Sequence, residues 1–369
     1  MILKTLSLTN FKNISNACLE FSPKINCFLG NNGMGKSNLL DAIHYLSITK
    51  SYGRLPDSML IKKDEDFAIL NGKYLRHGAD EEINVGLRRG ARKSFRRGGK
   101  EYKRLSEHIG LFPAVMVAPA DHNLITGPSE ERRRFIDVII SQTDAPYLDA
   151  LMRYNQALEQ RNRMLRDEMT DSILFSAIES VMDEAAGFIT RRRDEHIEKL
   201  SDIFKRHYHR IAGSDEKVVL EYDKSGKDYK SLAEALQAAT RRDRILKYTS
   251  VGPHRDDIVF TLDSMPVKQT ASQGQTKTFT VSLRFAQYDF LANSIGRKPL
   301  LLLDDIFDKL DSRRVEKIVE MVSSEDFGQI FITDTNRKHL DEIMSSTGDD
   351  YRMWSVDDGV FTLSTDETH

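Results

Sequence analysis

The sequence predicts an α/β fold that carries an inserted, mainly helical second lobe. Near the N-terminus a strand runs into a glycine-rich loop and then into an amphipathic helix. Near the C-terminus an apolar run is typical of a strand buried on both faces. Between these ends the chain changes to long, charged, helical periodicity. We therefore expect the two ends to form one lobe and the middle to form another.

Length and composition favour a folded chain of two lobes. The chain has 369 residues, more than one ordinary domain of about 100–200 residues. A net charge of −2 excludes a basic coat over the whole surface, but it leaves local basic stretches open. Two cysteines, Cys18 and Cys27, provide no disulfide framework, and no segment reaches the roughly 18 apolar residues of a membrane helix. We expect a cytoplasmic protein without a membrane partner.

The predicted elements follow the spacing of the apolar residues. They alternate in short bursts between residues 6 and 29, which is typical of strands, and after Gly30 they take helical spacing. Antiparallel strands are expected between residues 66 and 108. A helical texture begins after Gly127-Pro128, and strand character returns at Ile258-Val259-Phe260 and again from Leu300.

These changes of texture divide the chain. We assign residues 1–128 and 250–369 to a head lobe and residues 129–249 to the mainly helical lobe.

A phosphate-binding loop is predicted between the first strands and the first helix. The stretch Gly30-Asn31-Asn32-Gly33-Met34-Gly35-Lys36-Ser37 fits G-x-x-x-x-G-K-[ST] at every fixed position. Glycines let backbone N–H groups converge on phosphate oxygens, and the N-terminus of the following helix adds a positive dipole. Lys36 is expected to reach the outer phosphates of ATP, and Ser37 to ligate Mg²⁺. The competing interpretation is a glycine turn whose lysine is merely solvated.

The second element is acidic and is expected at the end of the buried strand near the C-terminus. Leucines 300–303 are followed by Asp304 and Asp305. Asp304 is the candidate Mg²⁺ ligand, and Asp305 is the candidate group that orients the attacking water. The alternative is a core strand that ends in a solvated acidic turn.

A third element, Ser272-Gln273-Gly274-Gln275-Thr276-Lys277, ends a polar loop and opens a helix. Such a helix start can bind phosphate, yet the chain already has one phosphate loop. Two sites on one chain make sense if the second faces a nucleotide held by another copy. An ordinary capped helix is the alternative.

In this order the three elements resemble the ATP-binding-cassette head, with Walker A, a signature loop, Walker B and then a D-loop at Lys309-Leu310-Asp311. Further stretches over nearly the whole chain are similar to the RecF family of bacterial recombination-repair proteins. They are Leu29 to Asn38; Ala118-Pro119-Ala120-Asp121 followed by Arg132-Arg133-Arg134-Phe135-Ile136-Asp137; Leu158-Glu159-Gln160-Arg161-Asn162; and Gly252-Pro253-His254-Arg255-Asp256-Asp257.

The resemblance implies an ABC-type, SMC-like ATPase head with a helical second lobe and no long coiled coil. It also implies ATP-dependent homodimerisation, DNA binding at single-strand gaps, and a pathway shared with RecO, RecR and RecA. By carry-over, Lys36 and Ser37 hold phosphate and Mg²⁺, and Asp304 holds Mg²⁺. The residues that would reach the nucleotide of the opposite subunit are Ser272, Gly274 and Gln275. Asp311 would lie at the dimer seam.

Two positions depart from the cassette pattern. Transporter cassettes carry glutamate where this chain has Asp305, which is one methylene shorter. They usually place a histidine after the next strand, where this chain reads Thr333-Asp334-Thr335. Both departures predict slow hydrolysis, with ATP acting as a conformational clamp.

A basic stretch is the candidate DNA surface. Residues 88–104 contain nine basic side chains and one acid, Glu101. Such a high density of positive charge would bind DNA phosphates through counterion release. An equal alternative is the edge of a hairpin whose charges prevent aggregation. We expect the segment 252–257 to belong to an ion-pair network joining the lobes rather than to a metal site.

Three other classes of function compete with this interpretation. A transporter-type motor subunit would require a membrane partner and fast hydrolysis. A structural head would bind ATP as a folding ligand and never touch DNA. A small-molecule P-loop kinase would have no use for a signature loop that acts on a second subunit.

Overall fold

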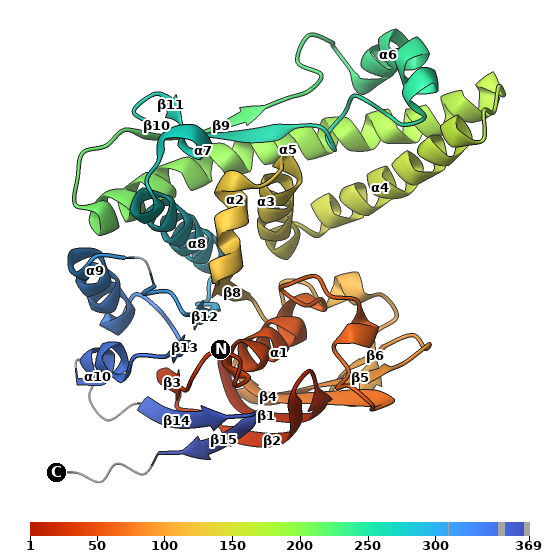
Figure 1. Ribbon diagram of the computed structural model, residues 1–369. Coiled ribbons are helices and arrows are strands. Elements are labelled where there is room, and N and C mark those ends of the chain that lie inside the picture. The colour runs from red at the N-terminus through yellow and green to blue at the C-terminus, as the bar shows by residue number, and fades with distance from the viewer. Residues whose placement is uncertain (309, 346–350, 365–369) are drawn as a thin grey trace. The chain divides into compact units, whose positions relative to one another are not determined.

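The computed structural model describes residues 1–308, 310–345 and 351–364 (Figure 1). The chain forms two compact units. Unit 1 comprises Met1–Asp121, Arg210–Gly213 and Gln273–His369, and unit 2 comprises His122–His209 and Ser214–Ser272. The sequence predicts lobe boundaries at 128/129 and 249/250, which differ from these units and remain a prediction.

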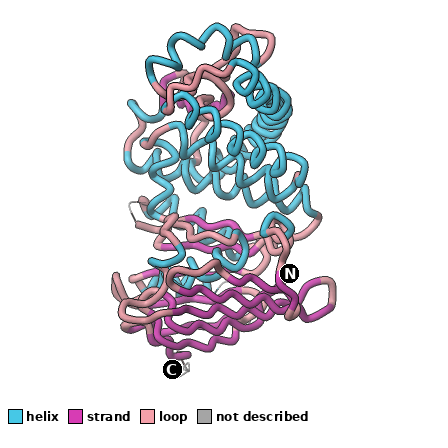
Figure 2. Tube along the Cα trace, turned by 90° about the vertical axis from the view of Figure 1, so that its right-hand side faces the viewer, coloured by secondary structure: helices cyan, strands magenta, loops and turns pink. Residues whose placement is uncertain are grey.

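Unit 1 contains an antiparallel sheet with the strand order β2-β1-β4-β5-β6-β7, and its neighbouring strands appear as magenta traces in Figure 2. Its strands are β1 (Ile2–Phe11), β2 (Ile14–Glu20), β4 (Phe67–Arg76), β5 (Ala79–Arg88), β6 (Ser94–Arg97) and β7 (Lys100–Glu101). Residues alternate between the two faces; along β4, Ala68 and Leu70 are buried, whereas Phe67 and Ile69 are exposed. The strands expected between residues 66 and 108 are present.

The second sheet of unit 1 positions the site. Its order is β15-β14-β3-β13-β12-β8, and all its neighbouring pairs are parallel except β14 with β15. The strands are β3 (Ile25–Leu29), β8 (Ala114–Val117), β12 (Leu300–Asp304), β13 (Ile330–Asp334), β14 (Tyr351–Asp357) and β15 (Val360–Leu363). Because β3, β13 and β12 are parallel neighbours, their carboxyl ends meet at one edge, which is where such sheets bind ligands.

The helices of unit 1 are α1 (Lys36–Ile48), α8 (Gln273–Ile295), α9 (Ser312–Ser323) and α10 (Arg337–Ser345). Short 3₁₀ turns lie at η1 (Asp57–Met59), η2 (Leu105–Glu107) and η3 (Pro119–Asp121). Residues of α1 pack in one core with both sheets, including Leu39 and Ile43 of the predicted apolar face. The four leucines of β12 are fully buried, as their apolar run predicts.

Unit 2 is mainly helical. Its helices are α2 (His122–Thr126), α3 (Ser129–Thr143), α4 (Ala145–Arg166), α5 (Ser172–Ala212), α6 (Leu232–Leu246) and α7 (Val267–Thr270), and the last residues of α5 are assigned to unit 1. A small antiparallel sheet has the order β11-β10-β9, formed by β9 (Val218–Asp223), β10 (Asp257–Leu262) and β11 (Met265–Pro266). In the part of the chain that the structure describes, no helix is long and apolar enough to cross a bilayer.

Buried arginines form the polar core of unit 2. Arg193 is 2% exposed, and its guanidinium donates to both carboxylate oxygens of Asp137, at 2.9 and 3.0 Å, and to the carbonyl of Pro253 at 2.7 Å. Arg161, 1% exposed, pairs with Asp243 at 2.7 Å and with Glu179 at 2.8 Å. Such burial is tolerated only because each guanidinium meets carboxylates and further acceptors.

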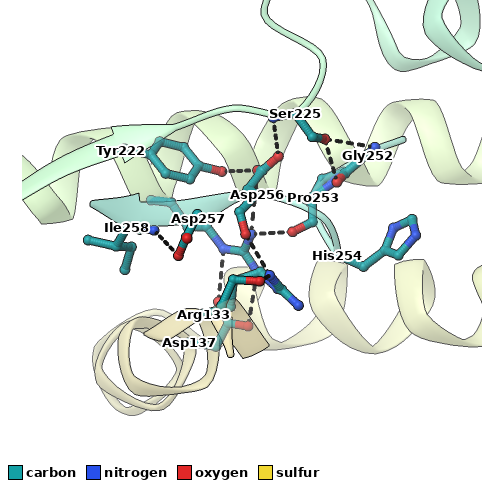
Figure 3. Close-up of polar contacts among 12 residues, drawn as sticks. Arg133, Asp137, Tyr222, Ser225, Gly252, Pro253, His254, Asp256, Asp257 and Ile258 are labelled. Carbon is teal, nitrogen blue, oxygen red and sulfur yellow. Dashed lines mark hydrogen bonds and ion pairs between the residues drawn. The ribbon is translucent and has the colours of Figure 1, made fainter. Parts of the chain in front are cut away.

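The segment 252–257 belongs to this core (Figure 3). Asp256 accepts hydrogen bonds from the Tyr222 hydroxyl and from the backbone N–H of Ser225, and its carbonyl accepts one from Arg133. Burial lowers the pKa of His254 to about 4, so its imidazole is neutral at pH 7. The segment thus lies in a network of hydrogen bonds, and the partners named here all belong to unit 2.

Candidate functional site

The glycine loop connects β3 to α1, and its backbone requires glycine. Gly33 and Gly35 have φ angles of 84° and 108°, a region that strains residues with a Cβ. Gly30 has a different constraint, because a Cβ there would lie 2.3 Å from the carbonyl oxygen of Val356 on β14. The loop is therefore held tightly against the sheet at one end and turned into the helix at the other.

Lys36 lies inside this loop. It is 6% exposed, and its Nζ donates hydrogen bonds to the carbonyls of Gly30 and of Asn31, the latter at 2.9 Å. Burial lowers the pKa of the ammonium, an effect opposed by the nearby Asp305, Asp304 and Asp334 carboxylates. The lysine that the motif assigns to phosphate thus lies among the acidic residues at the end of the sheet.

Ser37 and Asp304 meet at the start of α1. The Ser37 hydroxyl donates to Oδ1 of Asp304 at 2.8 Å, and the Thr333 hydroxyl donates to the same oxygen at 2.8 Å. Burial raises the pKa of Asp304, and these two hydrogen bonds oppose that shift. A hydroxyl beside a buried carboxylate is an oxygen donor pair of the kind that Mg²⁺ prefers, so the residues present fit this ion.

Asp305 occupies a strained position just after β12. Its φ angle is 47°, and its backbone N–H donates to the carbonyl and the hydroxyl of Thr333, both at 3.2 Å. Burial raises the pKa of its carboxyl, and the neighbouring Asp334, Asp304 and Asp308 raise it further. A carboxylate with a raised pKa is a better proton acceptor near neutral pH, which suits a group that orients water.

An open pocket of about 930 Å³ adjoins the glycine loop. Asn13 lines it and accepts a 2.7 Å hydrogen bond from Asn38 on α1. The other lining residues combine basic, polar and apolar side chains: Lys12, Ser15, Ser58, Met59, Ile61, Lys62, Lys63, Arg89, Asp358 and Val360. The walls of this pocket come from segments far apart in the chain, so no single stretch of sequence points to it.

The predicted signature residues lie at the start of α8. Gly274 and Gln275 form its first turn, whereas Ser272 is the last residue assigned to unit 2. A Cβ on Gly274 would lie 2.7 Å from the guanidinium of Arg314, which pairs with Asp311 at 3.0 Å. Asp311 also caps α9, while Lys309 of the predicted D-loop lies outside the described residues.

Three residues at this edge were not assigned roles from the sequence. Thr333 connects Asp304 to Asp305 through the hydrogen bonds above, although it comes from the neighbouring strand β13. Asp334 ends β13, and one of its carboxylate oxygens lies 2.9 Å from Nδ1 of His339 on α10. Because Asp334 follows an apolar strand, the order of elements could have suggested that it lies at this edge. It could not have suggested the pairing of Asp334 with His339.

Comparison with known proteins places this geometry in a family. The RecF/RecN/SMC N-terminal domain family matches residues 2–359. The DNA replication and repair protein RecF of Parabacteroides distasonis is 50% identical, over 97% of this chain and 98% of the relative. RecF of Bacteroides thetaiotaomicron is 49% identical, over 98% of each chain.

Solved structures agree with this assignment. A structure of the recombination mediator protein RecF-ATP in the RecFOR pathway has a TM-score of 0.88 at 29% identity, over 99% of this chain and 98% of the other. An Smc head domain from Pyrococcus furiosus, at 18% identity and a TM-score of 0.57, over 98% of this chain and 96% of the other, shares the fold. The predicted class, an ABC-type ATPase head with a helical second lobe, is therefore confirmed. The chain belongs to the RecF family of DNA replication and repair proteins, within the wider RecF/RecN/SMC family.

Proposed function

We propose that this chain is an ATP-dependent DNA-binding protein of recombinational repair, which dimerises around ATP and binds DNA at single-strand gaps. The convergence of Lys36, Ser37, Asp304 and Asp305 at one sheet edge carries the nucleotide part of the proposal. Membership of the RecF family supports the role in DNA repair. A related solved structure is described as RecF-ATP, which supports ATP as the ligand.

The glycine loop would bind the phosphates of the nucleotide, and the end of β12 would help to bind its Mg²⁺. Backbone N–H groups of residues 30–35 would surround the phosphates, and Lys36 would turn from the loop carbonyls to the outer phosphates. Ser37 and Asp304 would hold Mg²⁺, which neutralises phosphate charge when it is bound. The pocket beside Asn13 would take the base and ribose, to which its polar side chains would offer hydrogen bonds.

Hydrolysis is proposed to be slow. Asp305 would orient the attacking water, but its side chain is one methylene shorter than the glutamate of transporter cassettes. The φ angle of 47° at this residue fixes where the short side chain can reach. A site that binds ATP well and hydrolyses it slowly suits a clamp that stays closed while a partner acts.

The clamp would be a homodimer. Ser272, Gly274 and Gln275 would contact the ATP of the opposite subunit, and Asp311 would lie at the seam. RecR, with RecO and RecA in the same pathway, would be the protein partners, since the related structure is described within the RecFOR pathway. A cytoplasmic location fits this role and the two unpaired cysteines.

Light scattering tests the proposal most directly. Molar mass would be measured with Mg²⁺ alone, with ADP and with ATP, each with and without a gapped duplex. We expect one subunit without ATP and two with ATP, and we expect the gapped duplex to strengthen the dimer. A monomer under every condition would contradict the clamp, because the signature residues would then have no nucleotide to meet.

The basic stretch gives a second prediction. Three of its nine basic residues already serve the fold: Lys93 pairs with Asp57, Arg97 pairs with Glu81, and Arg89 donates to backbone carbonyls. The other six are exposed: Arg88, Arg92, Arg96, Lys100, Lys103 and Arg104. These six are the candidates for DNA phosphates.

We expect the double variant Arg92→Glu/Arg96→Glu to weaken duplex binding. Each phosphate contact contributes about 0.9 to the slope of log affinity against log salt, so the slope should fall by about 2. Fluorescence anisotropy over a salt series measures this change. Lys73→Glu, at an exposed lysine of β4 outside the stretch, is the control. An unaltered affinity and slope in the double variant would place the DNA surface elsewhere.

A further inference from the structure

Asp334 lies where a bound polyphosphate would be close. It ends β13, is 3% exposed, and is opposite Leu29, the residue before the glycine loop. Its charge acts on Lys36, proposed to meet the outer phosphates, and on Asp305, proposed to orient the attacking water. The chain therefore places a buried carboxylate beside the groups that are proposed to act on the outer phosphates.

Such a carboxylate is unfavourable unless its charge is balanced. Three further carboxylates lie at the same edge: Asp304, Asp305 and Asp308. Like charges in a buried site repel one another, and a polyphosphate would add to the repulsion. Lys36 and Lys277 are near Asp304, and Mg²⁺ would neutralise part of the charge. Asp334 requires a partner of its own.

His339 is that partner. Its Nδ1 lies 2.9 Å from Oδ2 of Asp334, and its ring packs against Phe307 at 5.0 Å between centroids. The other oxygen of Asp334 accepts the backbone N–H of Asn336 at 2.8 Å, which fixes the connection to α10. The imidazole is thus held between the end of β13 and the segment that follows Asp305.

We propose that His339 is a positioning residue of the ATP site, acting through Asp334. By hydrogen bonding to the Asp334 carboxylate, the imidazole holds it in one orientation and stabilises it, so that a terminal phosphate can approach. The pair stands after the strand where transporter cassettes place a single histidine. This inference depends on the proposed ATPase function, since it assigns a role to a residue of the same site.

The test compares ATP with ADP. We expect His339→Ala to weaken Mg²⁺-ATP binding about tenfold, which corresponds to about 1.4 kcal/mol, and to change ADP binding much less. Only ATP carries the phosphate that would face an Asp334 carboxylate that has lost its hydrogen bond to His339. Titration calorimetry with both nucleotides measures the ratio. Lys338→Ala, at the exposed neighbouring residue on α10, is the control.

A second variant separates positioning from packing. Asp334→Asn removes the charge, so adding His339→Ala to it should leave the ATP to ADP affinity ratio unchanged. An unaltered ratio in His339→Ala, or equal losses for both nucleotides that Asp334→Asn does not rescue, would overturn the inference. A wild-type protein that binds no Mg²⁺-ATP would instead overturn the proposed function.

Discussion

Replacing Lys36 by alanine is expected to abolish ATP-dependent dimerisation. The substitution removes the buried ammonium that the loop holds beside Asp304 and Asp305. Hydrogen bonds to a charged group contribute about 1.5–3 kcal/mol each, so the loss of even one corresponds to at least about a tenfold weaker affinity for ATP. Nucleotide titration gives the affinity, and light scattering gives the mass.

The substitution also removes the hydrogen bonds from Lys36 to two loop carbonyls, so folding must be checked by thermal unfolding. Lys73→Ala, at an exposed lysine of β4, is a matched control that should dimerise normally. ATP-dependent dimers of the Lys36→Ala protein, formed as readily as those of the wild type, would refute the clamp.

Replacing Asp305 by asparagine should have the opposite effect on the dimer. The amide can neither accept a proton nor orient water as a carboxylate does, so turnover should fall by about 10²–10⁴ while ATP remains bound. The dimer should then persist after ATP addition. Asparagine tolerates the φ angle of 47°, so the backbone should be preserved. Phosphate release and the lifetime of the dimer are the measurements.

The same variant should stabilise the fold at neutral pH in the absence of nucleotide. The pKa of Asp305 is raised in the folded protein, so the folded state binds more protons than the unfolded state as this carboxyl titrates. The wild type therefore loses stability as pH rises through that range, and a neutral amide does not. Denaturant unfolding at several pH values measures the difference.

Asp308→Asn is the matched control, since Asp308 is an exposed acid of the same segment. It should leave turnover close to that of the wild type. Normal turnover in Asp305→Asn would mean that Asp305 does not orient the water.

The residues that meet at this sheet edge could largely be picked out from short-range sequence. The motif spacing identified Lys36 and Ser37, and the apolar run before Asp304 marked it as the end of a buried strand. The 2.8 Å contact between Ser37 and Asp304 then follows from geometry, because parallel neighbouring strands end at one edge. The contact also requires β3 and β12 to lie on either side of β13, and the sequence does not state this arrangement.

Contacts that depend on strand neighbours were not predictable in this way. Thr333 meets Asp304 only because β13 lies next to β12, and the sequence does not state this order. Likewise the apolar residues 258–260 predict a strand, but they do not say that β10 pairs with β9. Pairing partners far along the chain are set by tertiary packing, which apolar periodicity does not encode.

The buried arginines of unit 2 also affect the alignment of its long helices α4 and α5. Apolar contacts are not directional, so a helix that slides by one turn, about 5.4 Å, would keep part of them. In that shift Arg161 on α4 would lose the carboxylate of Glu179 on α5, and Arg193 on α5 would lose the Tyr147 hydroxyl on α4. Breaking a buried ion pair costs about 3–5 kcal/mol. These polar contacts therefore favour one alignment of α4 and α5 over alignments shifted by a turn.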